Sequence, residues 1–162
     1  MSDAHPALEI PELATDFVFR ERPFPIPGDL RPSWRVGLVV LLLRYCSRAK
    51  KSTIARLQVL NWGVRDSQTS DALQSAIDGR AEPQMLIVRF DPFLIRAIAY
   101  AAAEGLVAYE NGKSVKLLDE GSALAEELFA AEGAFVREKQ FIARIGRSLT
   151  EAWVNTLFGW KT

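Results

Sequence analysis

The stretch that most constrains the fold of this chain is KKSTIARLQVLNWGVRD, residues 50–66. Ser52 and Thr53 are suited to cap a helix, and the pattern predicts a helix over residues 52–65. Its apolar residues fall on two nearly opposite faces of a helical wheel: Leu57, Leu60 and Val64 on one, and Ala55, Val59 and Trp62 on the other. A helix that is apolar on two faces is either buried within its own domain or shared with another chain.

The segments around that helix predict a mainly helical domain with one small β hairpin, which is an α+β fold. A buried helix is expected over residues 33–47, and a third helix over residues 71–79, after a break at residues 68–70. The β-rich sequence MLIVRF, residues 85–90, predicts a short strand. Asp91 and Pro92 are typical of a helix start, and that helix is expected to stop at Gly105.

The second half of the chain predicts a hairpin followed by helices. Residues 106–118, LVAYENGKSVKLL, contain Asn111-Gly112, a strong signal for a tight turn between two strands. Asp119 is expected to cap a long helical region that runs toward the carboxyl terminus and is loosened at Gly133 and Gly146.

The order of helices, strand and hairpin predicts a winged-helix-like domain. The stretch AAEGLVAYENGKSVKLLDEGSAL resembles the end of a winged helix, where a helix leads into the wing and a Glu-Gly pair opens the next helix. Residues 1–33 hold six of the eight prolines, which predicts an extended arm. We therefore divide the chain into an extended Pro-rich arm (1–33), a winged-helix-like domain (34–125) and a C-terminal helical docking region (126–162).

The helix over residues 91–104 is poorly suited to read DNA sequence. A reading helix needs Arg, Lys, Asn or Gln on its exposed face to contact base edges. This helix carries one basic residue, Arg96, among alanines and large apolar residues. The predicted wing adds Lys113 and Lys116, enough for one or two phosphate contacts. A helix that packs on both sides, or against a partner, is the favoured interpretation.

Positive charge is concentrated in one part of the chain. Residues 31–65 carry eight Lys and Arg and no Asp or Glu, although the whole chain has zero net charge. The clearest cluster consists of Arg44, Arg48, Lys50 and Lys51. It is either a solvated helix end and loop, where basic residues complement the helix dipole, or a contact for the DNA backbone or for an acidic partner surface.

The residue types that carry most catalytic and metal chemistry are scarce. His5 is the only histidine and Cys46 the only cysteine, so a cluster of Cys and His metal ligands is excluded. Cys46 is expected to be a small buried hydrophobic residue. We predict a non-enzymatic protein without a metal or cofactor. The sequence has no apolar run of roughly 18 residues and no secretory signal, so we expect a cytoplasmic protein.

The carboxyl-terminal sequence is rich in large apolar residues. They recur at helical spacings and either fold back on the domain or dock into another chain, in which Trp and Phe are effective anchors. The predicted docking residues are Ile145, Leu149, Trp153, Leu157, Phe158 and Trp160.

Three stretches resemble the small middle components of bacterial anti-phage operons of the ABC-three-component and Lamassu type: FDPFLIRAIAYAAAEGLV, KLLDEGSALAEEL and FVREKQFIARIGRSLTEAW. The resemblance spans most of residues 34–157, and Asp119 stands where threonine is commoner. In those families a short winged-helix protein accompanies an SMC-like ATPase and a larger, often nuclease-bearing effector subunit. The resemblance implies an adaptor that binds the ATPase and regulates or bridges the complex, with nonspecific DNA contact as an additional expectation. It implies no catalytic residues.

Two other functions fit the same residues. One is a stand-alone winged-helix transcription regulator, which would form a homodimer and bind operator DNA through the basic cluster and the wing lysines. The other is a dimerisation module similar to the kleisin partners of condensin-type complexes, which would differ from the adaptor only in its partner. Sequence-selective DNA binding by the isolated chain would distinguish the regulator from both protein-binding functions.

Overall fold

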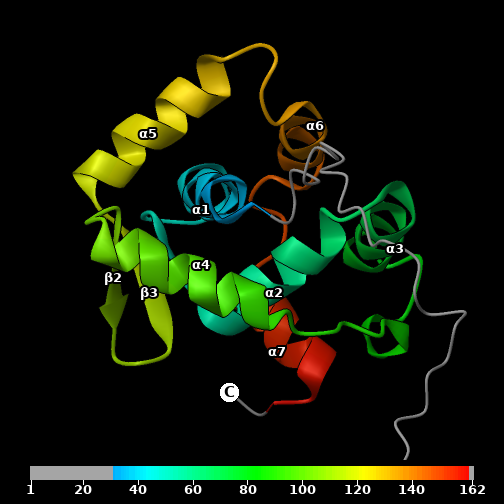
Figure 1. Ribbon diagram of the computed structural model, residues 1–162. Coiled ribbons are helices and arrows are strands. Elements are labelled where there is room, and N and C mark those ends of the chain that lie inside the picture. The colour runs from blue at the N-terminus through cyan, green and yellow to red at the C-terminus, as the bar shows by residue number, and fades with distance from the viewer. Residues whose placement is uncertain (1–30, 161–162) are drawn as a thin grey trace, which may run out of the picture.

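The computed structural model describes residues 31–160, which form a mainly helical α+β fold with one small sheet (Figure 1). The helices are α1 (Pro32–Leu41), which continues as the π-helix η3 (Leu42–Cys46), α2 (Ile54–Gly63), α3 (Ser67–Ile77), the 3-10 turn η4 (Pro83–Met85), α4 (Pro92–Ala103), α5 (Asp119–Ala130), α6 (Val136–Ile145) and α7 (Glu151–Phe158). The strands are β1 (Lys51–Thr53), β2 (Val107–Glu110) and β3 (Ser114–Leu117). The predicted fold class is confirmed.

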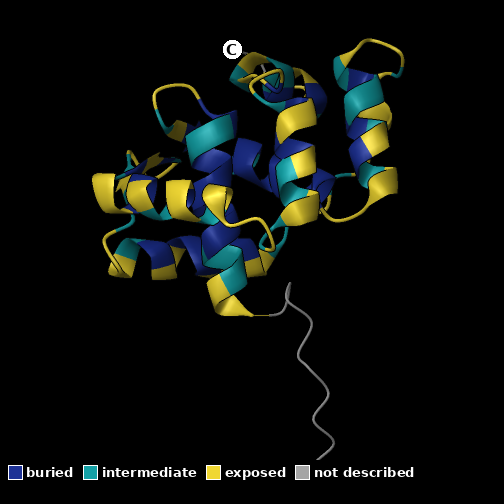
Figure 2. Ribbon diagram, turned by 90° about the horizontal axis from the view of Figure 1, so that it is seen from above, coloured by how far each residue is buried: buried dark blue, intermediate teal, exposed yellow. Residues whose placement is uncertain are grey.

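Two consecutive helical segments form the centre of the core. Residues 38–43 of α1 and η3 are all buried, and so is every residue of α2 from Arg56 onward. The predicted buried helix is thus confirmed over Ile54–Gly63, whereas Ser52 and Thr53 lie in a strand and Arg65 is exposed. From Arg56 onward α2 has no outward face for DNA. Figure 2 shows these buried residues enclosed by the outer helices, whose exposed turns face outward.

The three strands form an antiparallel sheet in the order β1-β3-β2. Asn111 and Gly112 both have positive φ, of 53° and 66°, so the predicted tight turn between β2 and β3 is confirmed. Strand β1 was not predicted, because Ser52 and Thr53 were assigned to the helix. In the structure Thr53 is the residue that caps α2, accepting a hydrogen bond from the Arg56 N–H.

The strand predicted over residues 85–90 is wrong. The segment contains the end of η4 and an irregular extended stretch, and it packs beside α7 rather than along an edge of the sheet (Figure 1). Alternating apolar residues favour an extended backbone, but a strand also needs a neighbouring strand with free hydrogen-bonding groups. No such edge lies beside this segment in the part of the chain that the structure describes.

Three predicted helix boundaries also need correction. Residues 68–70 lie inside α3, because Asp66 caps the helix and forms a reciprocal capping box with Thr69. Leu118, not Asp119, is the residue before α5, and Asp119 is its first helical residue. Pro32 and Ser33 begin α1 rather than ending the arm. The rest of the predicted arm, residues 1–30, lies outside the described residues, and so does His5.

The carboxyl-terminal region consists of three helices that share one core with the preceding elements. Phe141, Ile142 and Ile145 of α6 and Val154 and Leu157 of α7 belong to the same buried cluster as Leu57 of α2. The predicted division between residues 125 and 126 falls inside α5. Apart from α3, which lies between α2 and α4 in the chain, the elements follow the order α1, β1, α2, α4, β2 and β3. This order is compatible with a winged helix, and that assignment stays a prediction.

Candidate functional site

The start of α4 is held in place by polar residues of the core. Asp91 caps the helix, because one carboxylate oxygen accepts a hydrogen bond from the Phe93 N–H at 2.9 Å. The other oxygen forms an ion pair with the Arg35 guanidinium at 2.6 Å. Burial raises the pKa of Asp91, but the hydrogen bonds from Arg35 and Phe93 outweigh it and lower the pKa below its usual value. Its stabilising contribution is therefore present above the usual pKa and is lost as the pH falls through the lowered one.

Two buried polar residues of α2 complete this support. The Gln58 amide donates to the Asp91 carbonyl oxygen at 3.0 Å and accepts from the Asp91 N–H at 2.8 Å. Asn61 donates to the Asp91 carboxylate at 3.4 Å. These contacts explain why an otherwise apolar helix carries polar side chains: they fix the position at which the chain turns into α4.

The outward face of α4 is mostly apolar. Its inner face buries Leu94, Ala97, Ile98 and Ala101 in the core. Phe93 and Tyr100 are exposed on one flank of the helix, and Ile95 is exposed on the other. The guanidinium groups of Arg35 and Arg96 lie 5.3 Å and 5.6 Å from the centre of the Phe93 ring. Arg96 thus borders an aromatic side chain on this face, which offers little for base recognition.

The segment that leads into α4 extends this apolar face. Met85 and Ile87 are 78% and 77% exposed, whereas Leu86 and Val88 point inward and are half-buried. The backbone N–H groups of residues 87–90 donate no hydrogen bond to any residue that the structure describes. An extended segment with free backbone groups and exposed apolar side chains is a typical docking element for another chain.

A row of aromatic rings joins this segment to the end of α7. The Phe90 ring meets the Phe158 ring edge-on at 5.5 Å between centroids, and the Trp160 ring follows at 4.8 Å from Phe158. Trp160 is 51% exposed. We call the whole set the apolar surface; it consists of Met85, Ile87, Phe90, Phe93, Ile95, Tyr100, Phe158 and Trp160.

The predicted docking residues of the C-terminal region divide into two groups. Ile145, Leu149 and Leu157 are buried in the core and have no free surface to offer a partner. Trp153 is half-buried against that core. Phe158 and Trp160 alone contribute to the apolar surface, because α6 and α7 turn their regularly spaced apolar residues inward. Helical spacing does not distinguish a face that meets another chain from one that meets its own domain.

The predicted cationic residues are also separated by the fold. Arg44 pairs with Glu126 of α5 at 2.8 Å, and Arg96 lies on α4. The remainder are attached to the sheet and to the turn before it: Arg48, Lys50, Lys51, Lys113 and Lys116. Arg147, in the connection between α6 and α7, lies with Arg48 and Lys51 at a common cavity. Arg147 could not be assigned to this cluster from the sequence, because it is almost a hundred positions from Arg48.

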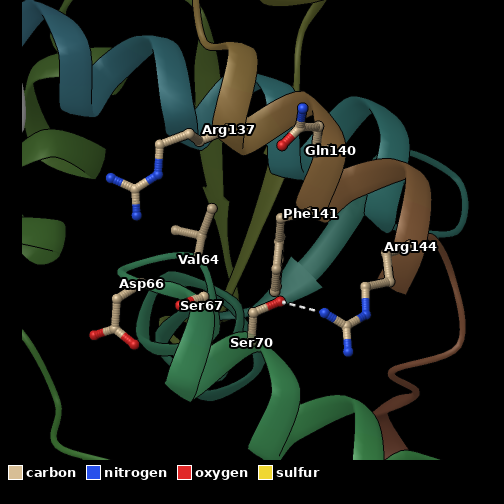
Figure 3. A pocket seen from close by; sticks show the side chains of 8 residues that line it. All are labelled: Val64, Asp66, Ser67, Ser70, Arg137, Gln140, Phe141 and Arg144. Atoms are coloured by element: carbon tan, nitrogen blue, oxygen red, sulfur yellow. Dashed lines mark hydrogen bonds between the residues drawn. The ribbon is translucent and has the colours of Figure 1, made fainter.

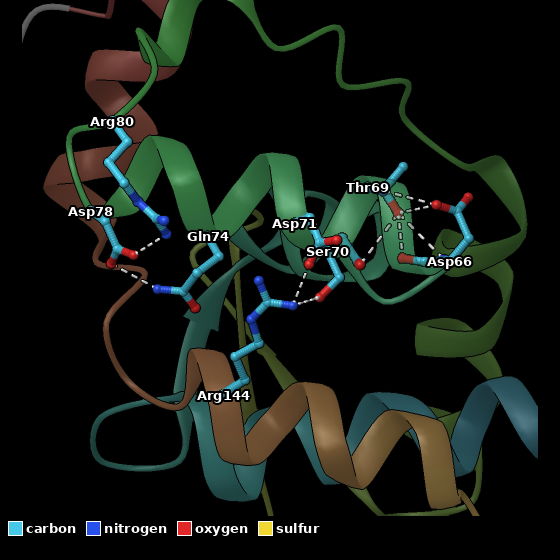
Figure 4. Close-up of polar contacts among 9 residues, drawn as sticks. Asp66, Thr69, Ser70, Asp71, Gln74, Asp78, Arg80 and Arg144 are labelled. Atoms are coloured by element: carbon cyan, nitrogen blue, oxygen red, sulfur yellow. Dashed lines mark hydrogen bonds and ion pairs between the residues drawn. The ribbon is translucent and has the colours of Figure 1, made fainter.

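Two grooves run along α6. One, of about 420 Å³, lies between α6 and α3, and its arginines, Arg137 and Arg144, flank Phe141 (Figure 3). The second, of about 540 Å³, shares Arg137 and extends to Asp91. Arg144 is engaged with Asp71 at 2.6 Å, and the carboxylate of Asp66 caps α3 (Figure 4). The charges of these grooves are therefore largely balanced by their own residues.

The Cys46 thiol is expected to be unreactive in the folded protein. Its side chain is fully buried, and burial raises the pKa of the thiol to about 12. A water-soluble disulfide reagent at about pH 8 should label it only after unfolding in urea. Rapid labelling of the native protein would contradict the packing of η3 against the core.

The chain matches no family model, no curated protein and no solved structure. The resemblance to three-component defence operons therefore stays a prediction that rests on the sequence. Within residues 31–160, no helix is both long and apolar enough to cross a membrane.

Proposed function

We propose that this protein is a non-enzymatic adaptor subunit that binds a partner chain through the apolar surface. The observation that carries the proposal is the exposure of Met85, Ile87 and Trp160 together with the outward face of α4. Apolar residues scattered singly on a surface are ordinary, but large exposed apolar side chains beside unpaired extended backbone are typical of a protein interface.

The composition of α4 supports a protein partner over operator DNA. In a winged helix this helix would enter the major groove, where bidentate contacts to bases need Arg, Lys, Asn or Gln. Here Phe93, Ile95 and Tyr100 are exposed, and Arg96 is the one basic residue of the helix. Aromatic residues of this kind anchor protein interfaces.

The partner class follows from the resemblance. We propose an SMC-like ATPase as the main partner, with a larger effector subunit of the same operon in the assembled complex and anti-phage defence as its role in the cytoplasm. The alternative, a stand-alone dimeric winged-helix transcription regulator, is favoured by one observation: the sheet carries Lys51 and Lys116 directly opposite each other on one exposed face.

The test is co-purification of the full chain with an SMC-like ATPase, which the proposal expects to be encoded in the same operon. Replacing Ile87 and Tyr100 with glutamate should weaken the complex at least about thirtyfold, because each change places a charge where an apolar contact of about 1–2 kcal/mol is lost. Tyr109→Glu is the matched control, since Tyr109 is similarly exposed but lies on β2, outside the apolar surface.

Two results would overturn the adaptor proposal. One is the absence of any complex between the unmodified chain and that ATPase. The other is equal recovery of the ATPase with the double variant and with the control, after thermal unfolding shows that both variants are folded. Tight sequence-selective binding of a DNA duplex, lost with Arg96→Gln, would instead establish the regulator.

A further inference from the structure

A buried arginine lies at the junction of the sheet, α2 and the carboxyl-terminal helices. Arg56 is only 4% exposed. Its guanidinium donates to the Leu149 carbonyl at 2.7 Å, to the Ser47 and Ser52 hydroxyls at 3.0 Å each, and to the Cys46 carbonyl. All four acceptors are uncharged. Within residues 31–160, no carboxylate forms an ion pair with Arg56, although buried charges are normally paired.

The charge of Arg56 is reinforced by other cations around one cavity. This cavity, of about 270 Å³, lies between the turn before β1 and the connection from α6 to α7, and it is lined by Arg48, Lys51, Arg56 and Arg147. Its carboxylate, Glu151, accepts hydrogen bonds from the Thr53 N–H at 3.0 Å and hydroxyl at 2.6 Å. Four positive charges thus face one negative charge, which is already bound to Thr53.

Two of these cations have no carboxylate as an ion-pair partner. Lys51 is paired with Glu110, but Arg48 and Arg147 form no ion pair with any described residue. Burial is the largest influence on the pKa of Arg56 and lowers it. The nearby Glu151 and Cys46 raise this pKa, and Arg48 lowers it further. An anion in the cavity would complete the charge balance.

The turn that presents Arg48 and Lys51 has an unfavourable backbone. Ala49 and Lys50, its two central residues, have φ of 49° and 58°, and the turn is closed by a hydrogen bond of 3.0 Å from the Lys51 N–H to the Arg48 carbonyl. This geometry suits Asn and Gly and costs other residues about 1 kcal/mol or more each. Strain of this kind is frequent at binding sites.

Further cations continue from the cavity across the sheet. Lys51 and Lys116 are directly opposite each other on β1 and β3, an arrangement that is unfavourable for like charges. The carbonyl of Lys113 accepts from the Ile54 N–H at 2.9 Å, which places the hairpin turn next to β1. The lysines therefore continue the positive charge from the cavity across the sheet, with Glu110, which pairs with Lys51 and lies near Lys116, among them. Successive phosphate groups along a nucleic-acid backbone suit such a row of cations.

We propose that the cavity between Arg48 and Arg147 binds a phosphate group of a nucleic-acid backbone, and that the strip of sheet lysines contacts the phosphates that follow. Arg48 and Arg147 contact the first phosphate. The buried Arg56 contributes positive potential at the cavity wall and keeps its hydrogen bonds to the protein. The site shares no residue with the apolar surface, so a failure of either proposal leaves the other one untouched.

The test measures binding of the full chain to a fluorescent random-sequence DNA duplex at several salt concentrations. Arg48→Gln combined with Arg147→Gln should weaken binding at least about tenfold and reduce the slope of log affinity against log salt by about 2, because two phosphate contacts are lost. Arg96→Gln, an exposed arginine outside the cavity, is the matched control and should change the affinity less than about twofold.

The competing results are distinct. Equal duplex binding by the double variant and the wild type, or no duplex binding by the wild type at low salt, would overturn the proposal. Parallel titrations with ATP and inorganic phosphate identify the source of the phosphate. Saturable binding of ATP that depends on Arg147, without duplex binding, would make this a nucleotide site and overturn the assignment to a nucleic-acid backbone.

Discussion

Arg56→Ala is expected to lower the free energy of unfolding by about 3–5 kcal/mol, because the carbonyls of Cys46 and Leu149 and the hydroxyl of Ser47 would lose their buried donors. The side chain joins the end of η3, the start of α2 and the connection before α7. Urea unfolding followed by tryptophan fluorescence measures the loss. A change below about 1 kcal/mol would mean that water replaces the guanidinium at little cost.

Arg56→Met separates the packing of this side chain from its charge. Methionine has a similar length and fills the same space, but it donates no hydrogen bond. We expect it to recover part of the stability lost in Arg56→Ala, since the cavity is refilled while the acceptors stay unsatisfied. If the methionine variant is folded, its weaker binding to a DNA duplex would assign the positive potential of Arg56 to the phosphate site.

Local signals predicted the parts of the fold that depend on a few neighbouring residues. Asp91-Pro92 and Asn111-Gly112 each act through their own backbone geometry, and both appear in the structure as predicted. Strand β1 could not be predicted in the same way. Its three residues adopt a strand because Lys51 and Thr53 pair with β3, more than 60 positions along the chain.

The segment over residues 85–90 illustrates the opposite error. Its alternation is present in the structure, where Leu86 and Val88 point inward and Ile87 points outward. The alternation reflects packing of Leu86 and Val88 against the core and exposure of Ile87 to solvent, not membership of a sheet. Sequence pattern predicts which side chains face inward, but the tertiary fold decides whether the backbone finds a partner.

The candidate surfaces could be predicted only in part, because the tertiary fold decides which apolar and basic residues come together. Phe158 and Trp160 were predicted to dock, and they do lie on the apolar surface, whereas Leu149 and Leu157 carry the same helical signal and are buried. The cavity joins Arg48 to Arg147 across the sheet and the last helices. Those two arginines meet because the start of α7 packs against the end of β1, where Glu151 accepts hydrogen bonds from Thr53.

Gly121→Ala is expected to destabilise the protein by about 3 kcal/mol or more, although alanine favours a helix over glycine by about 1 kcal/mol. Gly121 is in the first turn of α5, where that helix crosses the connection from α4 to β2. A Cβ atom there would lie 2.2 Å from the Leu106 carbonyl oxygen and 2.7 Å from Leu117 Cδ1. The carbonyl cannot move away freely, because it accepts a hydrogen bond of 2.9 Å from the Leu118 N–H.

Gly133→Ala is the matched control for this substitution. Gly133 has an ordinary φ, and a Cβ atom there would meet nothing within 4 Å. Its replacement should therefore leave the free energy of unfolding unchanged or raise it by up to about 1 kcal/mol through the lower entropy of the unfolded chain. Equal urea midpoints for the two variants would contradict the close approach of α5 to Leu106. A large loss confined to Gly121→Ala would confirm that α5 lies too close to Leu106 and Leu117 to admit a side chain at this position.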